Sequence, residues 1–231
     1  MTTTSDMSSR LLDALAGRPA AWRFIGSFAA DWRSALETSD GYEAAELDAA
    51  EERLGLKLPA ALREAYTLFG RRVDLTRNQD ELLTPSELHV YEDALVYQAE
   101  NQGAAHWGIL LSDLGNDDPA TVMRPDLADK SQECWEPWTD RLSVALIDLV
   151  MSETAIYNGD GLSDATELDD SVLAAFHRLP SVLPARHESS WYLGDDVLLH
   201  ALGDWWLTVR ARTTPALDAV REKHLVGWVN R

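Results

Sequence analysis

The chain has 231 residues, of which 45% are hydrophobic and 26% charged, a composition typical of a globular protein with one large or two small domains. Its net charge is −19, with 39 acidic against 20 basic side chains, which disfavours binding to nucleic-acid phosphates. The single cysteine, Cys134, excludes an internal disulfide and a thiolate zinc cluster. The sequence shows neither a signal peptide nor an apolar stretch of about 20 residues, so we expect a soluble, cytoplasmic protein that does not contact a membrane.

The N-terminal part of the chain predicts a helical extension. Residues 1–9 are polar, and we expect them to be disordered. In residues 10–37, large apolar side chains recur at three- and four-residue steps, which predicts a helix interrupted at Gly17 and Pro19. Residues 10–231, with this extension, are expected to form a single domain.

Two helices are expected after the extension. Asp40 followed by Glu43 resembles a capping box at the start of the first helix, which would end at Gly55. Pro59 suits the first turn of the second helix, because its missing N–H would be unpaired there anyway. Gly70 is a natural C-terminal cap.

Residues 94–111 carry the clearest β-hairpin pattern. Two apolar runs flank the tetrapeptide Glu100-Asn101-Gln102-Gly103, and Asn and Gly both adopt positive φ readily. An irregular edge strand is expected in residues 82–90, which include Pro85, and a short strand in residues 121–123.

The rest of the chain contains further helix and strand patterns, which do not strictly alternate. Trp135 and Trp138 are expected to anchor the start of a long helix over residues 139–158. Further helices are predicted over residues 168–179 and 214–224, and strands over residues 191–193, 197–202 and 205–211. Because helices and strands are segregated, the predicted class is α+β, a mixed, mostly antiparallel sheet with helices packed on it.

The sequence contains no recognisable catalytic motif. It has no Gly-x-Ser-x-Gly elbow, no metal-ligand spacing among its six histidines and no phosphate-binding loop. We therefore expect no enzymatic activity, no cofactor and no metal, and a buried, inert thiol at Cys134. A hydrolase with an unrecognised site stays open; it would require a cleft in which His106 or His200 approaches a carboxylate.

Two stretches of the chain contain acids but no Lys or Arg. One of them, residues 142–177, has seven acids. Between Asn78 and Met123 there is no Lys or Arg, but there are nine acids. Such a stretch would favour a basic partner through electrostatic steering. The alternative is that the acids serve solubility only.

Three blocks of the sequence, in this order, resemble the SUKH superfamily, which includes fungal cell-wall-synthesis regulators and bacterial toxin-immunity proteins. The resemblance covers about residues 40–157. It is carried by Glu46–Gly55 running into Leu58–Tyr66 and Gly70, by Tyr97–Gly103 with Trp107-Gly108 and Asp118-Pro119 beyond, and by Arg141-Leu142-Ser143.

The resemblance implies a non-enzymatic α+β domain that binds another protein. For a bacterial member it implies neutralisation of a co-encoded toxin, often a nuclease or deaminase; the alternative is a regulatory or scaffold protein of the same fold without a toxin partner. A toxin that acts on nucleic acid tends to be basic, which agrees with the acidic stretch. The predicted partner-binding residues are chosen by charge: Glu92, Asp93, Glu100, Asp117 and Asp118. The oligomeric state is not predicted.

Overall fold

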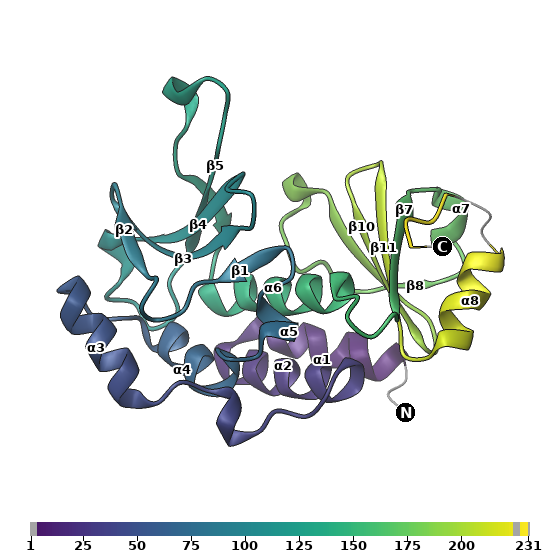
Figure 1. The fold of residues 1–231 in the computed structure, drawn as a ribbon, viewed down its shortest axis with the longest axis horizontal. Helices are drawn as coiled ribbons and strands as arrows, with labels where there is room; N and C mark the ends of the chain where they lie inside the picture. The colour runs from purple at the N-terminus through teal and green to yellow at the C-terminus, as the bar shows by residue number, and fades with distance from the viewer. Residues whose placement is uncertain (1–3, 224–226, 231) are drawn as a thin grey trace. The chain divides into compact units, whose positions relative to one another are not determined.

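A computed structural model describes residues 4–223 and 227–230, in which helices and antiparallel strands form two compact units (Figure 1). One unit comprises residues 35–150; the other combines residues 1–34 with 151–231. The predicted class α+β is confirmed. The single domain of residues 10–231 stays a prediction.

The unit of residues 35–150 contains a six-stranded antiparallel sheet and three helices, and it includes the N-terminal part of a fourth helix, α6 (Leu142–Ile156). Its sheet is built around β3 (Ala94–Glu100), which pairs with β4 along one side. On the other side, β2 pairs with the first half of β3 and β1 with the second half. The remaining elements are α3 (Ala44–Leu54), α4 (Ala60–Phe69), α5 (Val73–Thr76), β1 (Asp80–Leu82), β2 (His89–Tyr91), β4 (Ala105–Leu110), β5 (Thr121–Pro125) and β6 (Glu136–Thr139), with 3-10 turns at Thr38–Asp40, Leu111–Asp113 and Lys130–Gln132.

The β3–β4 hairpin confirms the prediction for residues 94–111. The turn contains Gly103 at φ +79°, where a residue without a Cβ is favoured. The first five residues of β3 are all buried, so both faces of this strand are covered. The expected edge strand at residues 82–90 is instead two short strands, β1 and β2, joined by a loop that contains Pro85.

The α3–α4 helix pair is held by a buried carboxylate. The side chain of Glu51, 4% exposed, accepts hydrogen bonds from the Leu58 backbone N–H (3.1 Å), from Lys57 (2.6 Å) and from Arg63 (2.8 Å). Burial alone would raise the pKa of this carboxyl, but these three donors together lower it. The expected capping box at Asp40 and Glu43 is displaced by one turn: Glu43 is the N-cap of α3 and exchanges hydrogen bonds with Glu46. Gly55 ends α3 with φ +69°, as predicted.

The second unit contains a five-stranded antiparallel sheet in the order β7-β11-β10-β9-β8. One sheet face packs against α8 through an apolar cluster that includes Val209, Leu217 and Val220. The opposite face carries Arg210, which donates to the Trp32 carbonyl at the end of α2. The elements are α1 (Thr4–Ala16), α2 (Arg18–Trp32), β7 (Ser163–Glu167), α7 (Asp170–Leu173), β8 (His177–Arg178), β9 (Ser189–Leu193), β10 (Val197–Leu202), β11 (Trp206–Ala211) and α8 (Thr214–Lys223), with a 3-10 turn at Ala185–His187.

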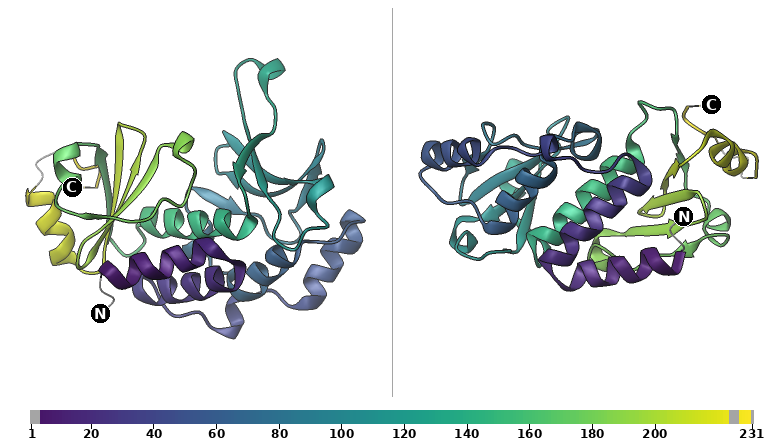
Figure 2. Two further views of the ribbon diagram at one scale, coloured as in Figure 1. Left: turned by 180° about the vertical axis from the view of Figure 1, so that it is seen from behind. Right: turned by 90° about the horizontal axis from the view of Figure 1, so that it is seen from below.

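Helices α1 and α2 lie side by side (Figure 2), joined at Gly17 where the interruption was predicted. The expected disorder of residues 1–9 is wrong from Thr4 onward, because α1 begins there and buries Met7 to 1% exposure; residues 1–3 lie outside the described residues. The sequence is polar at this end, but an amphipathic helix needs only a few apolar side chains to pack on its neighbour.

One further prediction from periodicity is wrong. Residues 168–179 form a four-residue helix, α7, and a two-residue strand, β8, instead of one long helix. The long helix begins at Leu142, three residues later than predicted, and the preceding segment forms strand β6 with Trp138 in it and Trp135 just before it. The anchoring of the helix by the two tryptophans stays a prediction. The final helix ends at Lys223 in the described residues, and residue 224 lies outside them.

A buried ion pair connects three segments of the second unit. The Arg210 guanidinium, 2% exposed, donates to both carboxylate oxygens of Asp160 at 2.8 and 2.6 Å and to the carbonyl of Tyr157. Arg33 from the end of α2 also donates to Asp160. Burial alone would raise the pKa of Asp160, but Arg210 and the Leu162 N–H outweigh burial and lower it to about 2.

Asp160→Asn should lower the free energy of unfolding at pH 7 by about 2 kcal/mol, because Arg210 would stay buried without a counter-charge. The folded-state pKa of Asp160 lies below its unfolded value, so this contribution is complete above about pH 4 and is lost as the pH falls toward 2. Urea unfolding at pH 7, 4 and 2.5 tests this. Asp218→Asn removes an exposed ion pair with Arg221 and should change stability by less than about 0.5 kcal/mol. Equal loss of stability between pH 4 and 2.5 in wild type and Asp160→Asn would contradict the assignment.

Candidate functional site

The five predicted partner-binding acids all lie in the unit of residues 35–150, at three loops. Glu92 and Asp93 form the two-residue turn between β2 and β3. Glu100 ends β3 at the turn of the hairpin, and Asp117 and Asp118 precede β5. The structure therefore places them at several points around the first sheet. Although they are close in sequence, they do not form one compact cluster.

Two of these acids are used to hold the fold. The Glu100 carboxylate accepts hydrogen bonds from the backbone N–H groups of Gln102 (2.7 Å) and Ala104 (3.0 Å) and from the Gln79 side chain (2.6 Å). Asp118 accepts from the N–H and hydroxyl of Ser143 at 2.8 and 2.6 Å, in the first turn of α6. A carboxylate at this position satisfies an unpaired helix N–H and interacts favourably with the helix dipole.

The other three acids are more open. Half of the Glu92 side chain is exposed, and its carboxylate pairs with Arg124 at 2.9 Å. Asp93 is exposed, and its side chain makes no hydrogen bond or ion pair with another described residue. Asp117 is exposed, while its backbone carbonyl accepts from Ala61.

Basic residues just outside the acidic stretch neutralise part of its charge. Arg77 pairs with Glu81 and with Glu87, both at 3.0 Å, and Arg124 pairs with Glu92. The charge count of residues 78–123 thus overstates the negative surface that they present. Among the predicted acids, Asp93 is the one with both an exposed carboxylate and no neutralising contact within the described residues.

Sequence reasoning missed a group of aromatic and charged side chains on one face of the first sheet, here called the Arg124 cluster. Arg124 on β5 lies opposite His106 on β4 in the register, and its guanidinium carbon is 5.1 Å from the centre of the Tyr91 ring. The Tyr91 ring contacts those of His106 (6.2 Å) and Trp135 (6.3 Å) at steep angles. Burial, with a smaller effect of the nearby His89, lowers the pKa of His106. The members are Tyr91, Glu92, His106, Arg124, Glu133 and Trp135.

The loop between β5 and β6 supplies the second acid of the cluster and extends beyond the strands of its sheet (Figure 1). The Glu133 carboxylate lies 3.5 Å from Arg124 and accepts hydrogen bonds from the Leu127 N–H (2.9 Å) and from Lys130 (2.8 Å). Lys130 also pairs with Asp126. This network fixes the loop onto the sheet, and a charge pattern alone could not predict it. The one signal in the sequence that could have pointed to the cluster was Arg124, the base that ends the acidic stretch. Cys134, in the same loop, is exposed and not buried as expected.

Exposed apolar side chains surround the β2–β3 turn. Val90, Tyr91 and Leu111 are 42%, 38% and 38% exposed. Leu111 is held beside the turn because its N–H donates to the Asp93 carbonyl at 2.8 Å. We call this surface the turn surface; its residues are Val90, Tyr91, Glu92, Asp93 and Leu111. Apolar side chains exposed next to unpaired charge are typical of protein-interaction surfaces, in which an aromatic anchor is surrounded by polar groups.

The geometry that a hydrolase would require is not formed by His106 or His200 in the described chain. His200 Nε2 lies 2.9 Å from the Ser189 hydroxyl, but its ring stacks on Trp191 at 3.9 Å. Burial lowers the pKa of His200 to about 3, so its imidazole is a weak proton acceptor. Within residues 4–223 and 227–230, neither histidine hydrogen-bonds to a carboxylate, so the base lacks the acid that would orient it.

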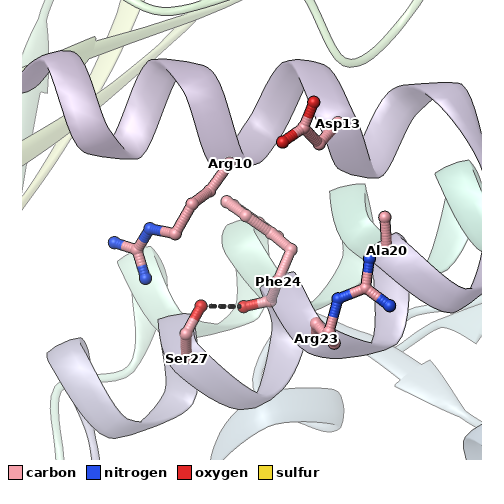
Figure 3. A pocket seen from close by; sticks show the side chains of 6 residues that line it. All are labelled: Arg10, Asp13, Ala20, Arg23, Phe24 and Ser27. Atoms are coloured by element: carbon pink, nitrogen blue, oxygen red, sulfur yellow. Dashed lines mark hydrogen bonds between the residues drawn. The ribbon is translucent and has the colours of Figure 1, made fainter.

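A pocket of ≈ 280 Å³ between α1 and α2 offers no convergent chemistry (Figure 3). The Ser27 hydroxyl donates to the Phe24 carbonyl of its own helix, and Arg10 pairs with Asp6 and Asp31. The pocket walls are mainly apolar, and the two remaining charged lining residues, Asp13 and Arg23, make no hydrogen bond or ion pair with another described residue. In the described residues, no group of three or more His, Cys, Asp or Glu side chains is arranged to hold a metal ion, and no helix is long and apolar enough to cross a membrane.

Comparison with known proteins finds no matching family model, no matching curated protein and no matching solved structure.

Asp118→Ala should lower the free energy of unfolding by about 1–2 kcal/mol, because the first turn of α6 would lose both hydrogen bonds at Ser143. Asp93→Ala is the matched control and should change stability by less than about 0.5 kcal/mol, since that exposed side chain makes no hydrogen bond or ion pair with another described residue. Chemical unfolding followed by circular dichroism measures both. Equal stabilities of the two variants would contradict the capping role of Asp118.

Proposed function

We propose that this protein is a non-enzymatic immunity protein that neutralises a basic toxin, for example a nuclease, by direct binding. The observation that carries the proposal is the turn surface, where Tyr91 and Leu111 are exposed beside the unpaired carboxylate of Asp93. The resemblance of residues 40–157 to the SUKH superfamily supports the same function.

The turn surface suits a basic partner in two ways. Its acids, together with a net charge of −19, attract a cationic protein and speed the encounter. Its apolar side chains can be buried in the complex, which slows dissociation. Glu92 contributes less to steering than Asp93, because Arg124 already neutralises it.

The binding role predicts a stoichiometric complex that protects cells. Co-expression with toxins encoded by neighbouring genes should restore growth, and the two proteins should co-purify. Rescue without a complex would contradict direct binding. Absence of both with every neighbouring toxin would favour a regulatory or scaffold protein of the same fold.

Asp93→Lys should slow association with the toxin by about tenfold and change dissociation less, because it reverses an exposed charge at the rim of the interface. Glu222→Lys on α8 changes the net charge of the protein equally and is the matched control. Stopped-flow or surface-plasmon-resonance rates separate the two effects. Equal slowing by both substitutions would show that only net charge matters and would remove the turn surface from the interface.

Association should also depend strongly on salt. Raising the ionic strength from about 0.05 M to 0.5 M shortens the screening length from about 14 Å to about 4 Å, so the association rate should fall by about tenfold or more. The dissociation rate should change much less. An association rate independent of salt would reject the electrostatic part of the proposal, even if the complex forms.

A further inference from the structure

The turn between β10 and β11 exposes a tryptophan. Trp205 is 64% exposed, the largest exposure among the large apolar side chains of the described residues. Its backbone is fixed, because the Trp205 carbonyl accepts a hydrogen bond from Leu168 (2.9 Å) and strand pairing resumes at Trp206. The indole also contacts the Trp206 ring at 5.6 Å. An indole held in solvent on a fixed turn is available to a ligand.

A pocket of ≈ 370 Å³ lies against the same turn. This volume is within the usual range of small-ligand sites. The pocket is lined by two carboxylates, one guanidinium and several hydroxyls. Its lining residues include Arg178, Glu188, Ser190, Gly203 and Asp204.

Gly203 brings the indole and a carboxylate to one place. It has φ +61°, and a Cβ at this position would lie 2.8 Å from Trp205 Cδ1 and 3.9 Å from Glu188 Oε2. The indole edge and the Glu188 carboxylate therefore lie on the same side of Gly203. Glu188 itself has φ +49°, an uncommon conformation for a side chain with a Cβ, and its carbonyl accepts from the Gly203 N–H at 2.8 Å.

The pocket contains charges of both signs. Neither Glu188 nor Asp204 pairs its carboxylate with another described residue. Arg178 is on the edge strand β8, across β9 from β10, and donates to the Ser190 hydroxyl at 3.0 Å. Trp205 directly follows Asp204, and its exposed indole lies beside the pocket at Gly203. Unpaired negative charge and an aromatic ring, both of which attract cations, are therefore neighbours at this turn.

We propose that this pocket binds a cationic side chain, arginine or lysine, with its charge against Glu188 and Asp204 and its stem or guanidinium plane against Trp205. The site is independent of the turn surface and does not depend on the proposed immunity function. A free polyamine carries the same chemistry, and the choice of probe separates these sources.

The test is an NMR titration of the full chain with Nα-acetyl-arginine amide in about 150 mM salt, which screens non-specific attraction to the acidic surface. Loss of one indole N–H signal in Trp205→Phe identifies the Trp205 resonance. We expect a saturable shift of this resonance with a millimolar dissociation constant, and at least tenfold weaker binding of the neutral isostere Nα-acetyl-citrulline amide. Titration with Nα-acetyl-lysine amide shows whether the pocket prefers an ammonium or a guanidinium group. If spermidine binds more tightly than both the arginine and the lysine probe, the pocket is a polyamine site, and the side-chain proposal is overturned.

Glu188→Gln and Asp204→Asn should each weaken arginine binding several-fold. Asp195→Asn, in the β9–β10 turn of the same sheet, removes an equal charge and should leave the dissociation constant unchanged. An unperturbed spectrum away from the pocket shows that each variant is folded. Equal shifts with the arginine and citrulline probes, no saturable shift with any probe, or equal affinity in all three charge variants would overturn the proposal.

Discussion

The arrangement of side chains in the Arg124 cluster, on one face of the first sheet, depends on the buried charge of Arg124. Its side chain is 9% exposed, and a guanidinium in such a position is tolerated only where carboxylates compensate the lost hydration. Glu92 from the β2–β3 turn and Glu133 from the β5–β6 loop supply that compensation, and Tyr91 lies over the cation. One side chain therefore connects a turn, a strand and a long loop, and it fixes the position from which the turn surface faces solvent.

The same requirement explains why many acids of this protein are not available to a partner. Glu51 holds the α3–α4 pair, Asp118 caps α6, and Asp160 neutralises Arg210. Each of these carboxylates satisfies a donor that would otherwise be unpaired or surrounded by low dielectric. The excess of acids over bases in the sequence consequently measures two properties at once, internal pairing and surface potential. Only carboxylates such as that of Asp93, exposed and without a contact in the described residues, belong clearly to the second.

The turn surface and the pocket beside Trp205 differ in the kind of recognition that they support. The turn surface combines exposed apolar side chains with unpaired charge, and suits a protein interface. The pocket beside Trp205 is concave and small, and an exposed indole lies next to its carboxylates, which suits a single cationic group. They lie in different units of the chain, so each can be tested without disturbing the residues of the other.

The sequence by itself determined the elements whose signals are local. The helix pair ending at Gly55 and Gly70, the β3–β4 hairpin and the long helix α6 all follow from short-range periodicity, capping and turn residues, and each is present. Only tertiary structure decided that the strands divide into two sheets, that residues 163–179 form β7, α7 and β8, and that β6 exists, because short strands gain their stability from distant partners such as β11, β9 and β5. The candidate site was likewise predicted from the sequence only in part. Composition identified acids near the β2–β3 turn, but only the tertiary structure decided which of them form hydrogen bonds or ion pairs within the protein. The role of a carboxylate is set by the donors that folding brings within about 3 Å of it.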